Sequence, residues 1–138
     1  MLRAFADLGY GVDWRVINPA DYSWCQRRKR VFLFIYRKDT DYFKQRKALD
    51  DFGVGNSGIF EETYPTRTEV LKDRNNSFSL PKDIIEVSDS FSTQFWNSGS
   101  MIEGQVVTQE LEPKYEGSRK VLGDILESPL DLSDTVYL

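Results

Sequence analysis

The chain has 138 residues, of which 40% are hydrophobic and 29% charged, a balance that predicts one folded domain of ordinary size. It contains no histidine and one cysteine, which excludes Ser-His-Asp triads, histidine-ligated metals, cysteine zinc sites and internal disulfides within this chain. Its net charge of −4 is unevenly distributed, since residues 1–50 hold 11 basic and 6 acidic side chains and residues 51–138 hold 7 and 16. This asymmetry indicates that the basic part meets a polyanion.

Targeting signals are not evident in the sequence. The most apolar run, residues 31–36, has six residues, far short of the roughly 20 that cross a membrane. The N-terminus shows no basic stretch followed by an apolar core, the pattern of a secretory signal. A single cysteine fits a reducing compartment. The sequence therefore predicts a soluble, cytoplasmic protein with no membrane partner.

The first 38 residues predict a helix and two strands. Residues 2–8 carry apolar side chains at helical spacing and precede a glycine, so they predict a short helix. Residues 14–18 are bulky and β-branched and precede a proline, which predicts a strand. After a polar turn at 20–25, residues 31–36 are apolar at every position, which is typical of a strand covered on both faces of a sheet. A compact loop between the two strands predicts an antiparallel pair.

The rest of the chain gives weaker signals. Residues 39–51 predict a capped helix, and the glycine-rich residues 52–58 predict a linker. Residues 61–90 are polar and give no clear element. Residues 95–108 predict a hairpin with its tight turn at 102–105. Residues 118–127 predict a short helix with an apolar stripe.

The basic run QRRKR at residues 26–30 is the most informative feature. A basic run on its own is typical of a solvated surface or a localisation signal, but this one continues directly into the apolar strand. Side chains two residues apart on an extended segment point the same way, so Arg28 and Arg30 are expected to share a face. Paired guanidiniums at the mouth of a buried strand can bind a phosphate or a polar base edge.

Two stretches resemble DNA cytosine-5 methyltransferases. Residues 8–37 are similar to the family's seventh and eighth motifs, which read roughly L-G-Y-x-V, a strand ending in N-A, and D-Y-G-x-P-Q-R-x-R-x-[FY]. The matching positions are Leu8, Gly9, Tyr10, Val12, Asn18, Ala20, Asp21, Tyr22, Gln26, Arg28, Arg30 and Phe32. Residues 97–127 resemble the first part of the family's target-recognition region. The two matches occur in the family's order and cover about half of the chain.

The chain also departs from the family pattern. Ser23 replaces the usual glycine, and Trp24 and Cys25 occupy the place of x-P. The sequence has no F-x-G-x-G cofactor loop, no Pro-Cys nucleophile, no E-N-V motif and no closing G-N-[AS] motif. Because Cys25 stands in the slot of a structural proline, we interpret it as an inert thiol rather than a nucleophile. The resemblance is therefore to an internal piece of a methyltransferase.

The resemblance implies a reaction and a set of site residues. The complete enzyme transfers a methyl group from S-adenosylmethionine to C5 of a cytosine that is flipped out of double-stranded DNA. Arg30 matches the family arginine that contacts the base, Arg28 matches its companion in the same pocket, and Gln26 matches a positioning residue. The chain alone is expected to be inactive and to bind neither S-adenosylmethionine nor a metal.

Together these observations predict an α/β class, as a mixed α+β fragment. Residues 1–38 are expected to be the end of the catalytic domain, with a helix and an antiparallel strand pair from the edge of a Rossmann-like sheet. Residues 39–138 are expected to begin the target-recognition domain. The uncovered apolar hairpin predicts a homo-oligomer built through residues 30–37. Two alternatives stay open: a free-standing nucleic-acid-binding module, and a degenerate remnant with only a structural role.

Overall fold

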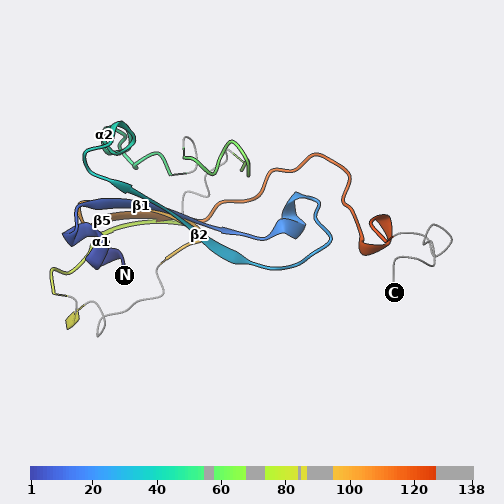
Figure 1. Cartoon of the computed structure of the whole chain (residues 1–138), viewed down its shortest axis with the longest axis horizontal. Helices are drawn as coiled ribbons and strands as arrows, with labels where there is room; N and C mark the ends of the chain where they lie inside the picture. Colours follow the sequence, from blue (N-terminus) through green and yellow to red (C-terminus); the bar gives the residue numbers. More distant parts are fainter. Residues whose placement is uncertain (55–57, 68–73, 84, 87–94, 127–138) are drawn as a thin grey trace, which may run out of the picture.

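The computed structural model describes residues 1–54, 58–67, 74–83, 85–86 and 95–126. Within them, five strands form one antiparallel sheet in the order β2-β1-β4-β5-β3, flanked by short helices (Figure 1). The strands are β1 (Tyr10–Ile17), β2 (Arg30–Arg37), β3 (Asn75–Ser79), β4 (Ser98–Ile102) and β5 (Gln105–Gln109). The helices are α1 (Leu2–Asp7) and α2 (Asp41–Lys47), and the 3-10 turns are η1 (Pro19–Tyr22) and η2 (Leu122–Asp124). The expected mixed α/β class is confirmed.

Strand β1 lies between β2 and β4 in the sheet. It pairs with β2 from Tyr10 opposite Arg37 to Ile17 opposite Arg30, which confirms the predicted antiparallel pair. It begins four residues before the predicted start and also pairs with β4 on its other side. Gly11 lets the strand start this early because it has no side chain. A Cβ at that position would lie 2.4 Å from the ring of Tyr36 on β2 and would clash with it.

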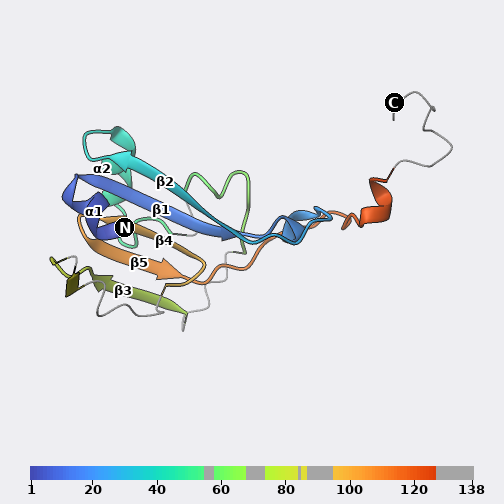
Figure 2. The same cartoon turned by 60° about the horizontal axis from the view of Figure 1, so that its bottom comes forward.

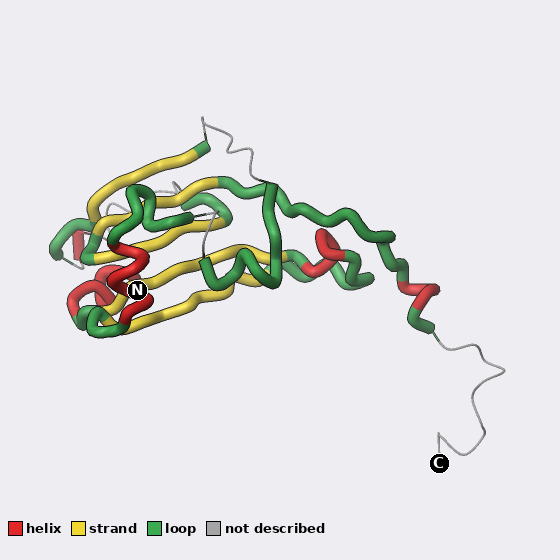
Figure 3. Tube along the Cα trace, turned by 90° about the horizontal axis from the view of Figure 1, so that it is seen from above, coloured by secondary structure: helices red, strands yellow, loops and turns green. Residues whose placement is uncertain are grey.

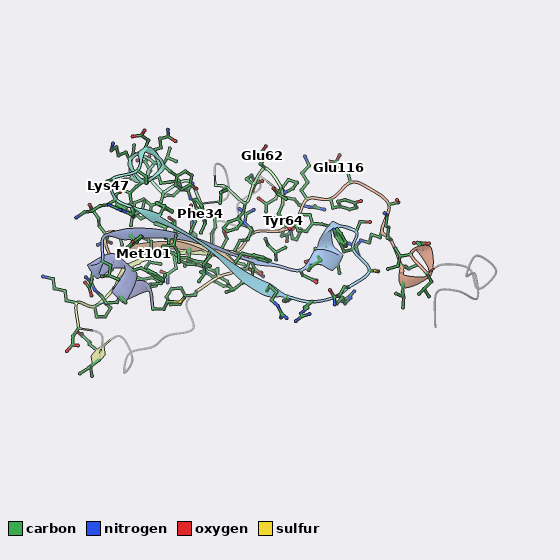
Figure 4. The ribbon with its side chains drawn as sticks, in the orientation of Figure 1. Phe34, Lys47, Glu62, Tyr64, Met101 and Glu116 are labelled. Atoms are coloured by element: carbon green, nitrogen blue, oxygen red, sulfur yellow. The ribbon has the colours of Figure 1, made fainter. Side chains whose placement is uncertain are left out.

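The two faces of the sheet carry different cores. On one face, Val12 and Trp14 of β1 pack with Met101, Val106 and side chains of α1. Because side chains alternate along a strand, the residues between them face the opposite side, where α2 lies. There Phe43 of α2 packs with Tyr36 and Ile102. Figure 4 shows this division, with Phe34 on the α2 side of the sheet and Met101 on the α1 side.

The β4–β5 hairpin forms as predicted. Ile102 pairs with Gln105, and Glu103 and Gly104 make the two-residue turn with positive φ angles of 52° and 81°. Gly99 on β4 leaves room for the indole of Trp14, because a Cβ at that position would lie 2.1 Å from the ring. Strand β3, which the polar sequence did not predict, pairs with β5 and forms an edge of the sheet (Figure 2).

The predicted helix at 39–51 is real but shorter. It starts at Asp41, capped by the hydroxyl of Thr40, which accepts a hydrogen bond from the amide of Phe43 at 3.3 Å. The helix ends at Lys47, and residues 48–54 continue as turns. The expected helix at 2–8 is confirmed as α1, which ends one residue earlier than predicted. Among the described residues, no helix is long and apolar enough to cross a membrane.

One prediction is wrong. In place of a helix at 118–127, the described residues 118–126 form only the short turn η2, with apolar side chains exposed at Val121, Leu122, Ile125 and Leu126. A helix this short needs a surface to pack against, and none of the described elements provides one. The continuous apolar run of β2 is typical of a strand covered on both faces, but β2 is an edge strand and Val31 is 57% exposed. This exposure is in keeping with the uncovered apolar hairpin expected from the sequence.

Candidate nucleic-acid interface

The connection between β1 and β2, residues 18–29, extends beyond the end of the sheet opposite α1 and α2 (Figures 1 and 3). The side chain of Asn18 hydrogen-bonds to both the beginning and the end of this connection. The side-chain amide donates to Asp21 Oδ1 at 3.2 Å, and Asn18 Oδ1 accepts from the backbone amide of Arg28, also at 3.2 Å. Asn18 therefore fixes the backbone of the basic run against the start of η1.

Ser23 ends η1 and attaches the connection to a distant segment. It adopts the left-handed conformation, with φ at 73°, which glycine takes without steric cost. Its Oγ donates to the carbonyl of Ser118 and accepts from the amide of Lys120 at 3.0 Å. The family pattern has glycine at this position, so the structure keeps the backbone conformation that glycine favours, while serine adds two hydrogen bonds.

The structure places the three predicted site residues on one exposed stretch. Gln26 and Arg28 lie in the connection, and Arg30 is the first residue of β2, opposite Ile17. All three predicted site side chains are exposed. The guanidinium of Arg30 makes one long hydrogen bond, from Nη1 to the carbonyl of Lys29 at 3.4 Å. The arginines therefore stand two residues apart at the entrance to β2 and are available to a ligand.

A small pocket of about 100 Å³ opens beside this stretch. It is lined by Arg15, Val16, Asn18, Asp21, Tyr22, Lys29, Thr66, Asn97, Leu111 and Pro113. Lys29 reaches it, whereas Arg28 and Arg30 are not among its lining residues. A metal site is not apparent there, because no three His, Cys, Asp or Glu residues gather in the described ranges.

Arg15 supports the floor of the pocket. Its side chain is buried and pairs with Glu61 at 3.1 Å, and it donates to the carbonyl of Tyr64 at 2.9 Å. Glu61 also accepts from the amide and hydroxyl of Thr66, at 2.7 and 2.9 Å. Because both partners of this partly buried pair have further hydrogen bonds, the ion pair can hold residues 61–66 over β1. Sequence reasoning missed Arg15, whose only signal is a charge in the middle of an apolar strand.

Tyr22, the last residue of η1, lines one side of the pocket. Its hydroxyl donates to the carbonyl of Pro65 at 3.3 Å, and its ring meets that of Tyr64 edge to face at 5.2 Å. Burial raises the pKa of the Tyr22 phenol to about 12. The phenol is therefore neutral at physiological pH, so it acts as a hydrogen-bond donor and a packing surface rather than as a general base.

These features occur in a chain that matches a known family along almost its whole length. The family of C-5 cytosine-specific DNA methylases matches residues 1–135. The chain belongs to this family. The motif that suggested the family in the sequence is the connection just described, with Asn18 at its base and Arg28 and Arg30 at its exit.

Two methylases among curated proteins are similar to the chain. The type II methyltransferase M.Sau3AI of Staphylococcus aureus is 44% identical over 133 residues, which is 95% of this chain and 32% of that protein. The type II methyltransferase M.MthTI of Methanothermobacter thermautotrophicus is 46% identical over 81 residues, 58% of this chain and 24% of that protein. The chain thus spans a third or less of these methylases. No solved structure matches it.

Proposed function

We propose that the chain carries two parts of a DNA cytosine-5 methyltransferase. One is the target-base loop, which is the β1–β2 connection at residues 18–29, and the other is the start of the target-recognition region. The observation that supports this most directly is the exposed pair Arg28 and Arg30, held at the entrance to β2 by the bonds of Asn18. The substrate is a specific sequence in double-stranded DNA, whose target cytosine leaves the helix to be methylated at C5. Since both relatives are named type II methyltransferases, the role is in restriction and modification. We infer a cytoplasmic location from this role on DNA.

Each predicted site residue has its own role in this proposal. Arg30 contacts the polar edge of the flipped cytosine and offsets the negative charge that develops on the ring during attack. Arg28 lines the same pocket, and Gln26 positions the loop. The nucleophilic thiolate belongs to another part of the complete enzyme. Cys25 is half-buried in the connection and is an inert thiol in this proposal.

S-adenosylmethionine supplies the methyl group in the complete enzyme. The pocket beside Lys29, at about 100 Å³, falls well below the roughly 300 Å³ at which sites for such molecules begin. This pocket is therefore too small for the cofactor. Since the sequence also has no F-x-G-x-G cofactor loop, we propose that the chain alone neither binds S-adenosylmethionine nor methylates DNA.

The functional division of the chain lies at residue 38 in this proposal. Residues 1–38 end the catalytic domain, and residues 39–138 begin the target-recognition domain. Both parts contribute to one sheet, because β1 pairs with β4 from Val12 opposite Met101 to Arg15 opposite Ser98. The target-base loop and the first recognition strands are thereby joined by hydrogen bonds, which would keep base binding and sequence recognition in a fixed relation.

The test is Arg30→Ala in the complete enzyme that contains this segment. Loss of an electrostatic contact to the reacting ring costs about 3 kcal/mol, so the methylation rate should fall at least about a hundredfold. Affinity for duplex DNA should change much less, because one arginine among many phosphate contacts adds little. Arg37→Ala is the control, since Arg37 lies at the other end of β2 and pairs with Asp39 on the surface. Equal losses of rate and affinity would make Arg30 a phosphate contact instead.

A free-standing nucleic-acid-binding module is the second candidate, favoured by the exposure of residues 26–30. It predicts salt-dependent DNA binding by the chain without any catalytic effect of Arg30→Ala. A degenerate remnant predicts neither DNA binding nor a loss of methylation.

A further inference from the structure

Ser23 fixes a second basic segment beside the target-base loop. Its hydroxyl donates to the carbonyl of Ser118 and accepts from the amide of Lys120 at 3.0 Å. Tyr115 also donates to the carbonyl of Ser118, at 3.4 Å. Residues 118–120 have no regular secondary structure, so these bonds, rather than a helix or strand, hold the segment in place. The two hydrogen bonds of Ser23 thus place this segment against the β1–β2 connection, which Figure 2 shows at the end of the molecule away from α1.

The attachment gathers positive charge at one end of the molecule. Six basic side chains form what we call the basic end, and all of them are exposed: Arg27, Arg28, Lys29, Arg30, Arg119 and Lys120. Within the described ranges, none of them makes an ion pair. At the opposite end, by contrast, Lys44 pairs with Asp41 and Lys47 pairs with Glu103. The basic end therefore presents its charge to a partner.

We propose that Arg119 and Lys120 bind backbone phosphates of the duplex that presents the target cytosine to Arg28 and Arg30. This inference rests on the proposed function and extends its DNA-binding surface to a segment about 90 residues further along the chain. Unpaired cations around a base-binding loop suit phosphates, since phosphate contacts fix the register of a protein on DNA while other groups read the bases. An acidic protein could bind the same charges, but such a partner would give no role to Arg28 and Arg30 as a pair that receives the target cytosine.

Ser23 is the positioning residue for this surface. A serine at a φ of 73° is strained, and its two bonds to residues 118 and 120 compensate for that strain. Ser23 is also only 7% exposed, so solvent does not compete freely for its hydroxyl. Loss of that hydroxyl should release Arg119 and Lys120 from the loop while leaving every charge in the chain.

The experiment measures binding of the chain to a short fluorescent DNA duplex by anisotropy over a series of NaCl concentrations. The slope of log affinity against log salt counts phosphate contacts, at about 0.9 per contact. The double variant Arg119→Gln/Lys120→Gln should lower that slope by about 2. The matched control, Lys44→Gln/Lys47→Gln, removes the same number of charges from the opposite end and should leave the slope unchanged. Circular dichroism checks that both variants are folded.

Ser23→Ala separates position from charge. It should lower the slope by about 1 to 2, although the net charge is that of the wild type. Equal slopes for the double variant and its control would overturn the proposal, as would an unchanged slope in Ser23→Ala. Failure of the wild-type chain to bind the duplex would also overturn it, while the proposed function would still be judged by the methylation rate of Arg30→Ala.

Discussion

Asp13 is a buried carboxylate with four side-chain partners among the described residues. It accepts hydrogen bonds from Tyr36 at 2.9 Å, Tyr42 at 2.8 Å and Ser100 at 2.6 Å, and it pairs with Arg46 at 3.2 Å. The residues of this ion pair, Asp13 and Arg46, are each 3% exposed. A buried pair of this kind is weak support for stability as a whole, but removal of one partner leaves the other charge without compensation. Asp13 thus links β1, β2, β4 and α2 at a single point.

The substitution Asp13→Asn should destabilise the chain by about 3–5 kcal/mol, because it leaves the Arg46 guanidinium charged and buried. Urea unfolding followed by circular dichroism measures the loss. Asp41→Asn is the control, since Asp41 pairs with Lys44 in the open and should cost less than about 1 kcal/mol. Similar losses for the two variants would show that the charge of Asp13 is not important for folding.

Two half-buried tyrosines predict a loss of stability at alkaline pH. Burial, followed by the charge of Asp13, raises the pKa of Tyr42 to about 12, and burial raises the pKa of Tyr22 to about 12. An unfolded tyrosine has a pKa of about 10, so ionisation is harder in the folded state. The stability contributed by these neutral phenols is complete below pH 10 and is lost as pH rises towards about 12. Urea midpoints measured across this range should fall less steeply in Tyr22→Phe/Tyr42→Phe than in the wild type, and parallel curves would contradict the assignment.

At the scale of elements, the β4–β5 turn depends on Gly104. Its φ of 81° lies in the left-handed region, and a Cβ there would lie 3.2 Å from the guanidinium of Arg3. Gly104→Ala should therefore cost about 1–2 kcal/mol. Gly123→Ala is the matched control, because it has no neighbour within 4 Å of the added Cβ and no positive φ. Urea unfolding of the two variants decides the matter, and equal stabilities would mean that the turn can rearrange.

The same turn shows why some elements could be predicted from the sequence and others could not. The β1–β2 pair and the β4–β5 hairpin are local, and their apolar runs and turn residues adjoin one another in the chain. Strand β3 reads N-N-S-F-S and gives no strand signal, because its pairing with β5 is decided by a distant partner. Residues 118–127 have helical periodicity, but periodicity gives a stable helix only where a surface covers the apolar stripe.

At the scale of the whole molecule, the sheet joins parts that the sequence presents as separate. Val12 of β1 pairs with Met101 of β4, and no local pattern announces a contact over that distance. The candidate site divides in the same way. Its loop and arginines were predictable from a motif, whereas the bonds of Ser23 to residues 118 and 120 and the pairing of Arg15 with Glu61 depend on distant segments.

The two edges of the sheet differ in a way that bears on assembly. Strand β3 forms one edge with four polar residues and Phe78, whose side chain packs against the core, so this edge is a poor template for another strand. Strand β2 forms the other edge with six apolar residues between two arginines. On the face of the sheet that carries Val12 and Trp14, the β2 side chains are exposed: Val31, Leu33 and Ile35. An open apolar edge of this kind favours pairing with a second strand.

We therefore predict that the isolated chain forms a homodimer or larger oligomer through residues 30–37, by strand pairing or exchange. Light scattering at high micromolar concentration should give a particle larger than the 16.0 kDa chain. Leu33→Asp should reduce it to a monomer, because it places a charge on the exposed face and lies outside both core clusters. Phe34→Asp should break the particle or unfold the chain, since Phe34 packs against Tyr42 with ring centroids 5.3 Å apart. Asn75→Asp on the polar edge should change nothing, and a monomeric wild type would refute the prediction.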